Sequence, residues 1–498
     1  MKMKIKKSIF LIASLLLMSV GCSDYLEVND NPNDPPISTP SLSLPVAQQN
    51  FASLNGTSMV YLGQFMTYNW TTPSNWSANQ ALIRYTITTS FYSNIFESSY
   101  LSVFKDLTYI QNYEDPSGSI DYSAYYAIAD IVKGFQYQLL VDLYGDVPYT
   151  EANLRAENRT PAYDDAETIY KDVIDKLTAA ASLALSLPAN AENPMDQDII
   201  FYGDMTKWAQ FANTIKLRML VRLSGTGQDA YIQEQVASIN ANGAGYITED
   251  VSSNPGYSDD AGKQSPFYGY IGKGPNNTEI DRNDYTVATD YTIDYLSNRN
   301  DPRLTRIYAE ADNGGYHGAE QSTILPGSGF TSDDLSKVGP GLLTSSTQDQ
   351  PIMLVSEALF IQAEAALNGY ISGGDSVAQQ LYNQAIEESF VFLGVEDAVN
   401  EAQTYYTQDL PNVSWTSSPN KLEAIITQKW IALNGTASIE SWIDLTRTGY
   451  PSGLPIPEES DGVRPVRLLY PDTEVGRNSQ NVPQQTGSDA FTDEPFWN

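Results

Sequence analysis

Two short clusters of aromatic and polar residues are the candidates for a binding site in this sequence. In the first cluster, Trp70 and Trp76 flank a turn-prone Thr-Pro-Ser-Asn segment, and each follows an asparagine, Asn69 and Asn75. Sugars present a C–H face that stacks on flat aromatic rings, and hydroxyl groups that hydrogen-bond to amides. The pattern predicts a carbohydrate-binding loop; the alternative is that both tryptophans pack in the core.

The second cluster runs from Asp281 to Tyr285, just before a predicted helix. Arg282 and Asn283 can donate hydrogen bonds to sugar hydroxyl groups while the ring of Tyr285 stacks on the sugar. The alternative is an Arg–Asp structural pair at a junction between loop and helix.

Few residues in the chain could perform catalysis. One Cys and one His among 498 residues exclude an intrachain disulfide, a thiolate metal cluster and most Ser-His, Cys-His and multi-His sites. His317 lies in a glycine-rich loop, where we expect it to be exposed to solvent. A glycosidase needs two suitably spaced carboxylates, but no acidic pair stands out in the sequence. We therefore predict no enzyme, no catalytic residue, no bound metal at a defined site and no cofactor. The acidic loops allow structural calcium, although no spacing fixes its ligands.

The charge balance restricts the possible partners. With 28 Lys and Arg against 61 Asp and Glu, the formal net charge is −33. An acidic surface repels phosphate backbones, so we predict no nucleic-acid partner. At 41% hydrophobic residues the chain can bury a large core.

The N-terminus has the pattern of an export signal. Lys2, Lys4, Lys6 and Lys7 precede a short apolar run, and Cys22, the one cysteine, ends a stretch that resembles a bacterial lipobox. We predict that residues 1–21 are a lipoprotein signal peptide and that Cys22 is lipidated. No later apolar run is long enough to span a membrane.

The rest of the chain is dominated by helical periodicity. The segment 128–143 repeats apolar residues on one helix face, and another helix is expected to begin at Asp164-x-x-Glu167 with Asp164 as its cap. Long irregular stretches at 55–80, 241–290 and 311–350 separate the helices. We predict loops there that present a recognition surface.

Small residues beside an aromatic recur as in tetratricopeptide repeats, where they let paired helices approach closely. One match is Gly134-x-x-Tyr137 followed by Ala166-x-x-x-Tyr170, and the other comprises Ala366, Ala378, Tyr382 and Ala385. The fold class predicted is all-α, a mainly helical scaffold of tetratricopeptide-like helix pairs with long irregular ligand-binding loops and little sheet. No low-complexity linker divides residues 22–498, so we predict a single domain.

Five local motifs, taken together and in this order, resemble those of the SusD/RagB-like outer-membrane nutrient-binding lipoproteins. The motifs are Asp142–Tyr149, Asn300–Leu304, Glu357–Ala366, Ile425–Ala432 and Trp442–Pro451. The last motif has Thr446 where family members often carry a second arginine.

The resemblance implies a lipid-anchored protein of the outer membrane, exposed at the cell surface. Members of this family bind oligosaccharides, or peptides in some branches, act as a lid on a SusC-like TonB-dependent transporter, and mostly lack catalysis. We therefore expect a lipoprotein that binds oligosaccharides and delivers them to such a transporter. The alternatives are a peptide-binding lipoprotein of the same transporter type and, further off, a glycoside hydrolase.

Overall fold

The computed structural model describes residues 38–154, 157–327 and 331–498. The signal peptide predicted for residues 1–21 and the lipidation predicted at Cys22 lie outside the described residues. The fold is mainly helical, as predicted, and carries tetratricopeptide-like helix pairs.

The helices, in chain order, are α2 (Pro40–Leu54), the π-helix η1 (Asn55–Met59), α3 (Val60–Met66), α4 (Gln80–Ile83), α5 (Ser93–Ser98), the π-helix η2 (Ser99–Phe104), α6 (Lys105–Gln111), α7 (Ser123–Tyr144), α8 (Ala166–Leu185), η3 (Met195–Gln197), α9 (Met205–Arg222), α10 (Asp229–Asn242), α11 (Pro266–Ile271), η4 (Pro275–Asn277), α12 (Asp281–Tyr285), α13 (Asp290–Ser297), α14 (Leu304–Ile307), η5 (Ser332–Asp334), α15 (Val355–Leu367), α16 (Gly374–Phe392), α17 (Ala398–Tyr406), α18 (Lys421–Ala432), α19 (Ser438–Thr448), α20 (Asp472–Arg477) and α21 (Asp489–Thr492). The strands are β1 (Trp70–Thr71), β2 (Val251–Ser253), β3 (Val287–Ala288) and β4 (Gln350–Met353).

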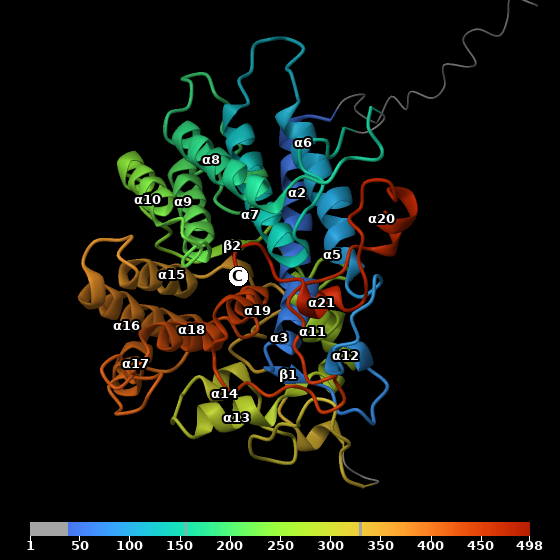
Figure 1. Cartoon of the computed structure of the whole chain (residues 1–498), viewed down its shortest axis with the longest axis vertical. Coiled ribbons are helices and arrows are strands. Elements are labelled where there is room, and N and C mark those ends of the chain that lie inside the picture. The colour runs from blue at the N-terminus through green and yellow to red at the C-terminus, as the bar shows by residue number, and fades with distance from the viewer. Residues whose placement is uncertain (1–37, 155–156, 328–330) are drawn as a thin grey trace, which may run out of the picture.

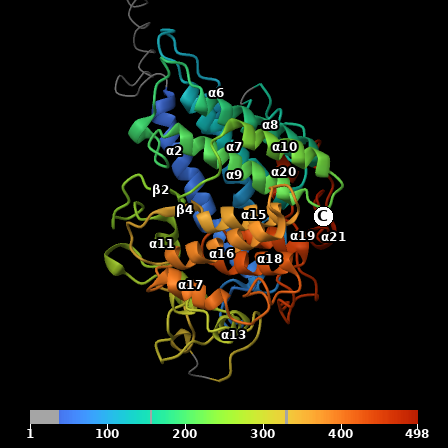
Figure 2. The same cartoon turned by 90° about the vertical axis from the view of Figure 1, so that its left-hand side faces the viewer.

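Two groups of helices form the body of the molecule. Helices α2 and α6–α10 gather in the upper half, α15–α18 lie below them, and α13 lies at the lower end, an arrangement that both views keep (Figures 1 and 2). Small residues let the paired helices approach. A Cβ atom at Gly134 of α7 would lie 2.9 Å from the Leu177 side chain of α8. In the α15–α16 pair, Ala366, Ala378 and Tyr382 are fully buried, which confirms the tetratricopeptide-like pattern.

The predicted loop 55–80 is wrong in its first part. Residues 55–66 are helical, in η1 and α3, and continue α2 without interruption. The Asn-Gly-Thr-Ser composition at 55–58 is typical of a turn, but Asn55 and Gly56 are buried, and Asn55 Nδ2 donates to the Phe51 carbonyl and to Gln136 Oε1. Tertiary packing therefore overrides the local preference.

Sheet structure is confined to two short antiparallel pairs in the described residues. Strand β1 pairs with β3, with Trp70 opposite Ala288 and Thr71 opposite Val287, and β2 pairs with β4. The β1–β3 pair joins the two sequence clusters that we predicted to bind ligand, although more than 200 residues separate them along the chain.

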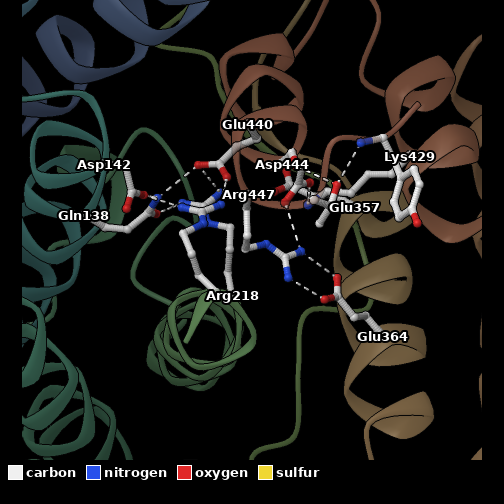
Figure 3. Close-up of polar contacts among 12 residues, drawn as sticks. Gln138, Asp142, Arg218, Glu357, Glu364, Lys429, Glu440, Asp444 and Arg447 are labelled. Atoms are coloured by element: carbon white, nitrogen blue, oxygen red, sulfur yellow. Dashed lines mark hydrogen bonds and ion pairs between the residues drawn. The ribbon is translucent and has the colours of Figure 1, made fainter. Parts of the chain in front are cut away.

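Charged residues from four of the motifs form a buried network with Arg218 and Arg222 of α9 and Glu440 of α19, where α7, α9, α15, α18 and α19 meet (Figure 3). Arg222 of α9 pairs with Asp142 of α7 and donates to Glu440 Oε2 at 2.5 Å. Arg218 contacts Glu357 at 3.1 Å, and burial raises the pKa of the Glu357 carboxyl. These side chains are at most 2% exposed, so their charges are stabilised by one another rather than by water.

The second half of this network lies between α15, α18 and α19. Lys429 contacts Asp444 at 2.9 Å, and Arg447 donates two hydrogen bonds to the Glu364 carboxylate at 2.7 and 2.9 Å. Burial by itself would raise the pKa values of Glu440 and Asp444, but the neighbouring cations outweigh burial and lower both to about 2.

The Asn300–Leu304 motif is also internal. Arg303 is fully buried and donates to Asp301 at 2.7 Å and to Gln428 of α18 at 2.7 Å. Most charged residues of the motifs thus hold helices together, and a ligand site has to be sought elsewhere.

Candidate functional site

A cavity of about 580 Å³ opens beside α13, at one end of the β1–β3 pair. We call it the α13 cavity. Helix α13, the segment 451–458 and residues 320–321 supply most of its wall. It is lined by Tyr68, Asp290, Tyr291, Asp294, Tyr295, Asn298, Arg299, Glu320, Gln321, Asn412, Thr427, Pro451, Ser452, Pro455, Ile456 and Glu458.

An aromatic wall forms one side of the α13 cavity. Tyr291 and Tyr295 lie four residues apart on α13, so their rings share a helix face, with centroids 6.2 Å apart. Tyr68 meets Tyr291 edge to face at 6.4 Å, and Trp430 of α18 packs behind Tyr295 at 5.6 Å and 87°. Packed rings of this kind hold a flat surface in place for an apolar sugar face.

Hydrogen bonds at the start of α13 fix this wall. Thr289 caps the helix, because its hydroxyl accepts the Thr292 N–H at 3.2 Å. The hydroxyls of Thr289 and Thr292 donate to the Tyr68 carbonyl at 2.6 and 3.0 Å. Tyr68 adopts a left-handed backbone conformation (φ 58°), and its phenol oxygen accepts the Gln321 N–H at 3.1 Å. The segment before β1 is thereby fastened to α13.

Four residues that line the α13 cavity carry buried polar atoms without a hydrogen-bond partner among the described residues. These atoms are Tyr295 Oη, Arg299 Nε, Gln321 Oε1 and Thr427 Oγ1. A buried polar group left unpaired costs about 1–3 kcal/mol. A ligand rich in hydroxyl or amide groups would satisfy them, so the cavity suits a polar ligand with an apolar face.

The charges around the α13 cavity are mostly negative. Asp290, Asp294, Glu320 and Glu458 line it, and none of the four forms an ion pair in the part of the chain that the structure describes. Burial raises the pKa of Asp290. Arg299 is the basic residue in the lining, and its guanidinium carbon lies 3.5 Å from the centre of the Tyr295 ring. The cavity therefore favours neutral or cationic ligands over anionic ones.

The structure corrects the prediction for two residues of the first cluster. Trp70 and Asn69 are fully buried. The Trp70 ring packs against Tyr61 at 5.9 Å and Phe267 at 6.4 Å, and Asn69 Oδ1 accepts from Asn434 Nδ2 at 3.0 Å. For Trp70, the first residue of β1, the alternative of core packing therefore holds, and Asn69, directly before β1, is buried beside it.

The other two residues of this cluster are accessible. Trp76 is half-buried and packs against a small apolar group that includes Val287 and Leu325, and Asn75 is exposed. Their loop adjoins the α13 cavity, because the Ser74 N–H donates to the Thr323 carbonyl at 2.8 Å, two residues after Gln321. Ligand binding by Asn75 and Trp76 stays a prediction.

The second cluster lies at the other end of the β1–β3 pair, on α12. The Arg282 guanidinium lies 3.8 Å above the Tyr270 ring and donates to the Tyr270 carbonyl at 3.1 Å, and Asn283 donates to the Ile271 carbonyl at 3.0 Å. The Tyr285 side chain is half-buried, and its carbonyl accepts from Thr72 at 2.5 Å. This hydrogen bond from Thr72 brings the two predicted clusters next to each other.

No Arg–Asp pair explains the second cluster among the described residues. Asp284 instead pairs with Lys337 at 2.8 Å, from a distant segment. A ligand role for Arg282, Asn283 and Tyr285 stays a prediction, and none of the three lines the α13 cavity.

The residues of the α13 cavity were missed by sequence reasoning. The spacing of Tyr291, Tyr295 and Arg299 was the available signal, since residues four apart share one helix face. Gln321 and Thr427 carry no local signal, because chain segments far apart bring them to the cavity.

Two further features bear on the expectations. Among the described residues, no group of three or more His, Cys, Asp or Glu side chains is placed to hold a metal ion, so the calcium that the sequence allows has no such site there. In the same residues, every helix is too short or too polar to cross a membrane.

The chain is similar to proteins of known class. A family model of SusD-like proteins, described as "Starch-binding associating with outer membrane", matches residues 32–471. A solved chitin-binding protein is 25% identical, with a TM-score of 0.72, covering 89% of this chain and 95% of that one. A SusD homologue from Bacteroides fragilis is 21% identical, with a TM-score of 0.70 and coverage of 93% and 99%.

A chitin-binding SusD homologue from Flavobacterium johnsoniae has the same fold, at 19% identity and a TM-score of 0.68, covering 88% of this chain and 94% of that one. No curated protein matches the chain.

Proposed function

Because the chain belongs to the SusD-like family of outer-membrane nutrient-binding proteins, we propose that it binds oligosaccharides in the α13 cavity and delivers them to a SusC-like TonB-dependent transporter. Proteins of this family bind their ligands without catalysis, in agreement with the prediction that the chain is not an enzyme. Lipidation at Cys22 and exposure at the cell surface are part of the proposal. An acyl chain of the lipid contributes about 0.8 kcal/mol for each buried CH₂ group, so two or three chains anchor a protein durably.

The observation that carries the proposal is the pairing of a tyrosine wall with unpaired buried polar atoms. Tyr291 and Tyr295 offer the flat surface, while Thr427 and Gln321 offer hydrogen-bonding oxygens beside it. A sugar ring has both kinds of surface, an apolar C–H face and a rim of hydroxyls. Chitin binding by two proteins of similar structure supports a glycan as the ligand.

Peptide binding is the second candidate, and the acidic lining of the α13 cavity favours it. Basic peptides would be attracted by the four carboxylates, and their affinity would fall steeply with salt. Neutral glycans lack that salt dependence, so the salt dependence of the affinity separates the two ligands.

A glycan and peptide array probed with the purified protein tests the proposal. We expect a neutral or amine-bearing oligosaccharide as the best ligand, with a dissociation constant near the micromolar range, about −8 kcal/mol. Tyr291→Ala should lower the affinity for that ligand by about tenfold, because the substitution removes one of the two stacking rings of the aromatic wall. The matched control is Tyr202→Ala, which removes a tyrosine that is 57% exposed and outside the cavity.

Three results would contradict the proposal. A basic peptide bound more tightly than every glycan would favour the peptide candidate. Equal affinity of the Tyr291→Ala and Tyr202→Ala variants would exclude the α13 cavity as the site. Release of reducing ends from the bound glycan would show an enzyme.

A further inference from the structure

A second groove, of about 350 Å³, lies between η2, the segments 148–153 and 158–161, and α20. We call it the α20 groove. Helix α20 lies in the upper half of both views, away from α13 at the lower end (Figures 1 and 2). Most of the exposed surface in the groove is apolar: the ring centroids of Phe96 and Tyr100 lie 4.8 Å apart, and Leu101 is 67% exposed. An exposed leucine beside packed rings is suited to contact an apolar group from outside.

The α20 groove contains two free arginines, Arg159 and Arg477. Both are exposed and line the groove, and neither makes a hydrogen bond, ion pair or ring contact with the residues that the structure describes. Every other arginine in that part of the chain makes at least one such contact. In a chain of net charge −33, acidic residues far outnumber basic ones, so most arginines are expected to find a carboxylate partner. That the two free arginines share one apolar groove points to a partner's carboxylates as their counter-charge.

The acidic residues of the α20 groove are already engaged by its walls. Glu97 Oε1 accepts from the Thr473 hydroxyl at 2.7 Å, and Glu474 Oε2 accepts from the Tyr163 hydroxyl at 2.9 Å. Neither forms an ion pair with Arg159 or Arg477. Both carboxylates keep their charge, but neither pairs with an arginine, so the two guanidinium groups remain free to bind an anion.

A buried acceptor in the same groove adds a third point of contact. Asn153 donates its Nδ2 to the Tyr100 carbonyl at 3.0 Å, which leaves its Oδ1 buried and without a partner among the described residues. An amide oxygen in that position accepts a backbone N–H, a group that every peptide carries and a carboxylate lacks.

From these three features we propose that the α20 groove binds an acidic peptide segment of a partner protein. One apolar side chain of the segment packs on Phe96, Tyr100 and Leu101, flanking carboxylates pair with Arg159 and Arg477, and a backbone N–H reaches Asn153. The groove's volume fits one or two side chains, so the partner presents a short segment rather than a broad face. This site is separate from the proposed glycan cavity.

The test uses a synthetic peptide, Asp-Glu-Phe-Asp-Glu, acetylated and amidated at its ends, and binding measured by fluorescence anisotropy. Two comparison peptides change one feature each: Asn-Gln-Phe-Asn-Gln removes the charges, and Asp-Glu-Ser-Asp-Glu removes the ring. The protein variant is R159Q/R477Q. Its control is K263Q/K273Q, which removes the same charge at two exposed lysines outside the groove.

We expect the acidic peptide to bind, and both comparison peptides to bind at least about tenfold more weakly. R159Q/R477Q should lower the affinity for the acidic peptide by at least about tenfold, and K263Q/K273Q should lower it by less than about twofold. Added salt should lower the affinity of the wild-type protein for this peptide. Since all four substituted residues are exposed, the melting temperature should stay unchanged. Glycan binding should also be the same in R159Q/R477Q as in the wild-type protein, so this proposal and the glycan proposal fail independently.

Any of four outcomes overturns the proposal. These are no binding up to about 1 mM peptide, equal binding of the neutral peptide, an equal effect of the two double variants, and binding of N-acetylphenylalanine as tight as that of the peptide. The last outcome would identify a pocket for a small anion.

Discussion

The substitution Arg222→Met tests whether the buried charge network stabilises the fold as a set of mutually dependent charges. Arg222 is 2% exposed and lies between Asp142 and Glu440, which are themselves buried. Methionine keeps much of the volume but removes the charge, so it leaves two carboxylates with fewer partners. Breaking a buried ion pair on one side costs about 3–5 kcal/mol.

The structure places this variant near the lower end of that range. Asp142 keeps hydrogen bonds from Gln138 at 2.5 Å and from Trp497 Nε1 at 2.8 Å, and Glu440 keeps Arg218 at 3.4 Å. We therefore expect a loss of about 3 kcal/mol. Unfolding entropy near 2.1 cal/mol/K per residue sums to about 1 kcal/mol/K for this chain, so the melting temperature should fall by about 3 °C.

Differential scanning fluorimetry measures this shift. The double variant Arg222→Met/Asp142→Asn replaces one stranded carboxylate by an amide and should recover about 2 °C. The control is Arg84→Met, which breaks a pair with Glu459 whose side chains are 29% and 38% exposed and should cost less than about 1 °C. A melting temperature for Arg222→Met equal to that of Arg84→Met would refute the reasoning.

Three further predictions concern the predicted loop, a close helix contact and the titration of the network. Trp76→Ala should weaken the glycan found on the array while lowering the melting temperature by no more than about 2 °C, since Trp76 is half-buried; unchanged affinity would make Trp76 a packing residue alone. Gly63→Ala should lower the melting temperature by about 2 °C or more, because a Cβ there would lie 2.3 Å from the Ile439 backbone nitrogen, whereas Gly476→Ala, with open space around it, should not. The pKa of Glu440 is lowered in the folded state to about 2, so its ionised form stabilises the fold above its ordinary pKa and this contribution is lost as the pH falls toward 2. The destabilisation caused by Glu440→Gln should therefore be largest at neutral pH and shrink between about pH 5 and pH 2; a constant difference in melting temperature across that range would speak against it.

Much of the fold could be predicted because helix signals are local. Apolar periodicity over 128–143 and the small residues Gly134 and Ala378 correctly indicated paired helices. Local chemistry did not fix every boundary. Asp165, not Asp164, caps α8, because Asp164 accepts the N–H groups of residues 149 and 150 from the preceding segment. Two adjacent aspartates look alike until the tertiary partner of one is known.

The candidate site was harder to predict, because its residues meet only in three dimensions. Trp70 and Trp76 look equivalent in the sequence, yet the pairing of β1 with β3 turns Trp70 into the core and leaves Trp76 accessible. Gln321 and Thr427 join Tyr291 at the α13 cavity from segments that are far apart in the chain. No spacing rule connects such residues, so the sequence alone could not identify this cavity.

Three consecutive residues of helix α18 have three different roles. Thr427 borders the α13 cavity, Gln428 holds Arg303, and Lys429 belongs to the charge network. The opposite rim, at 451–458, is irregular and borders solvent. Substitutions at this rim can therefore alter the α13 cavity without disturbing the buried contacts of Gln428 and Lys429.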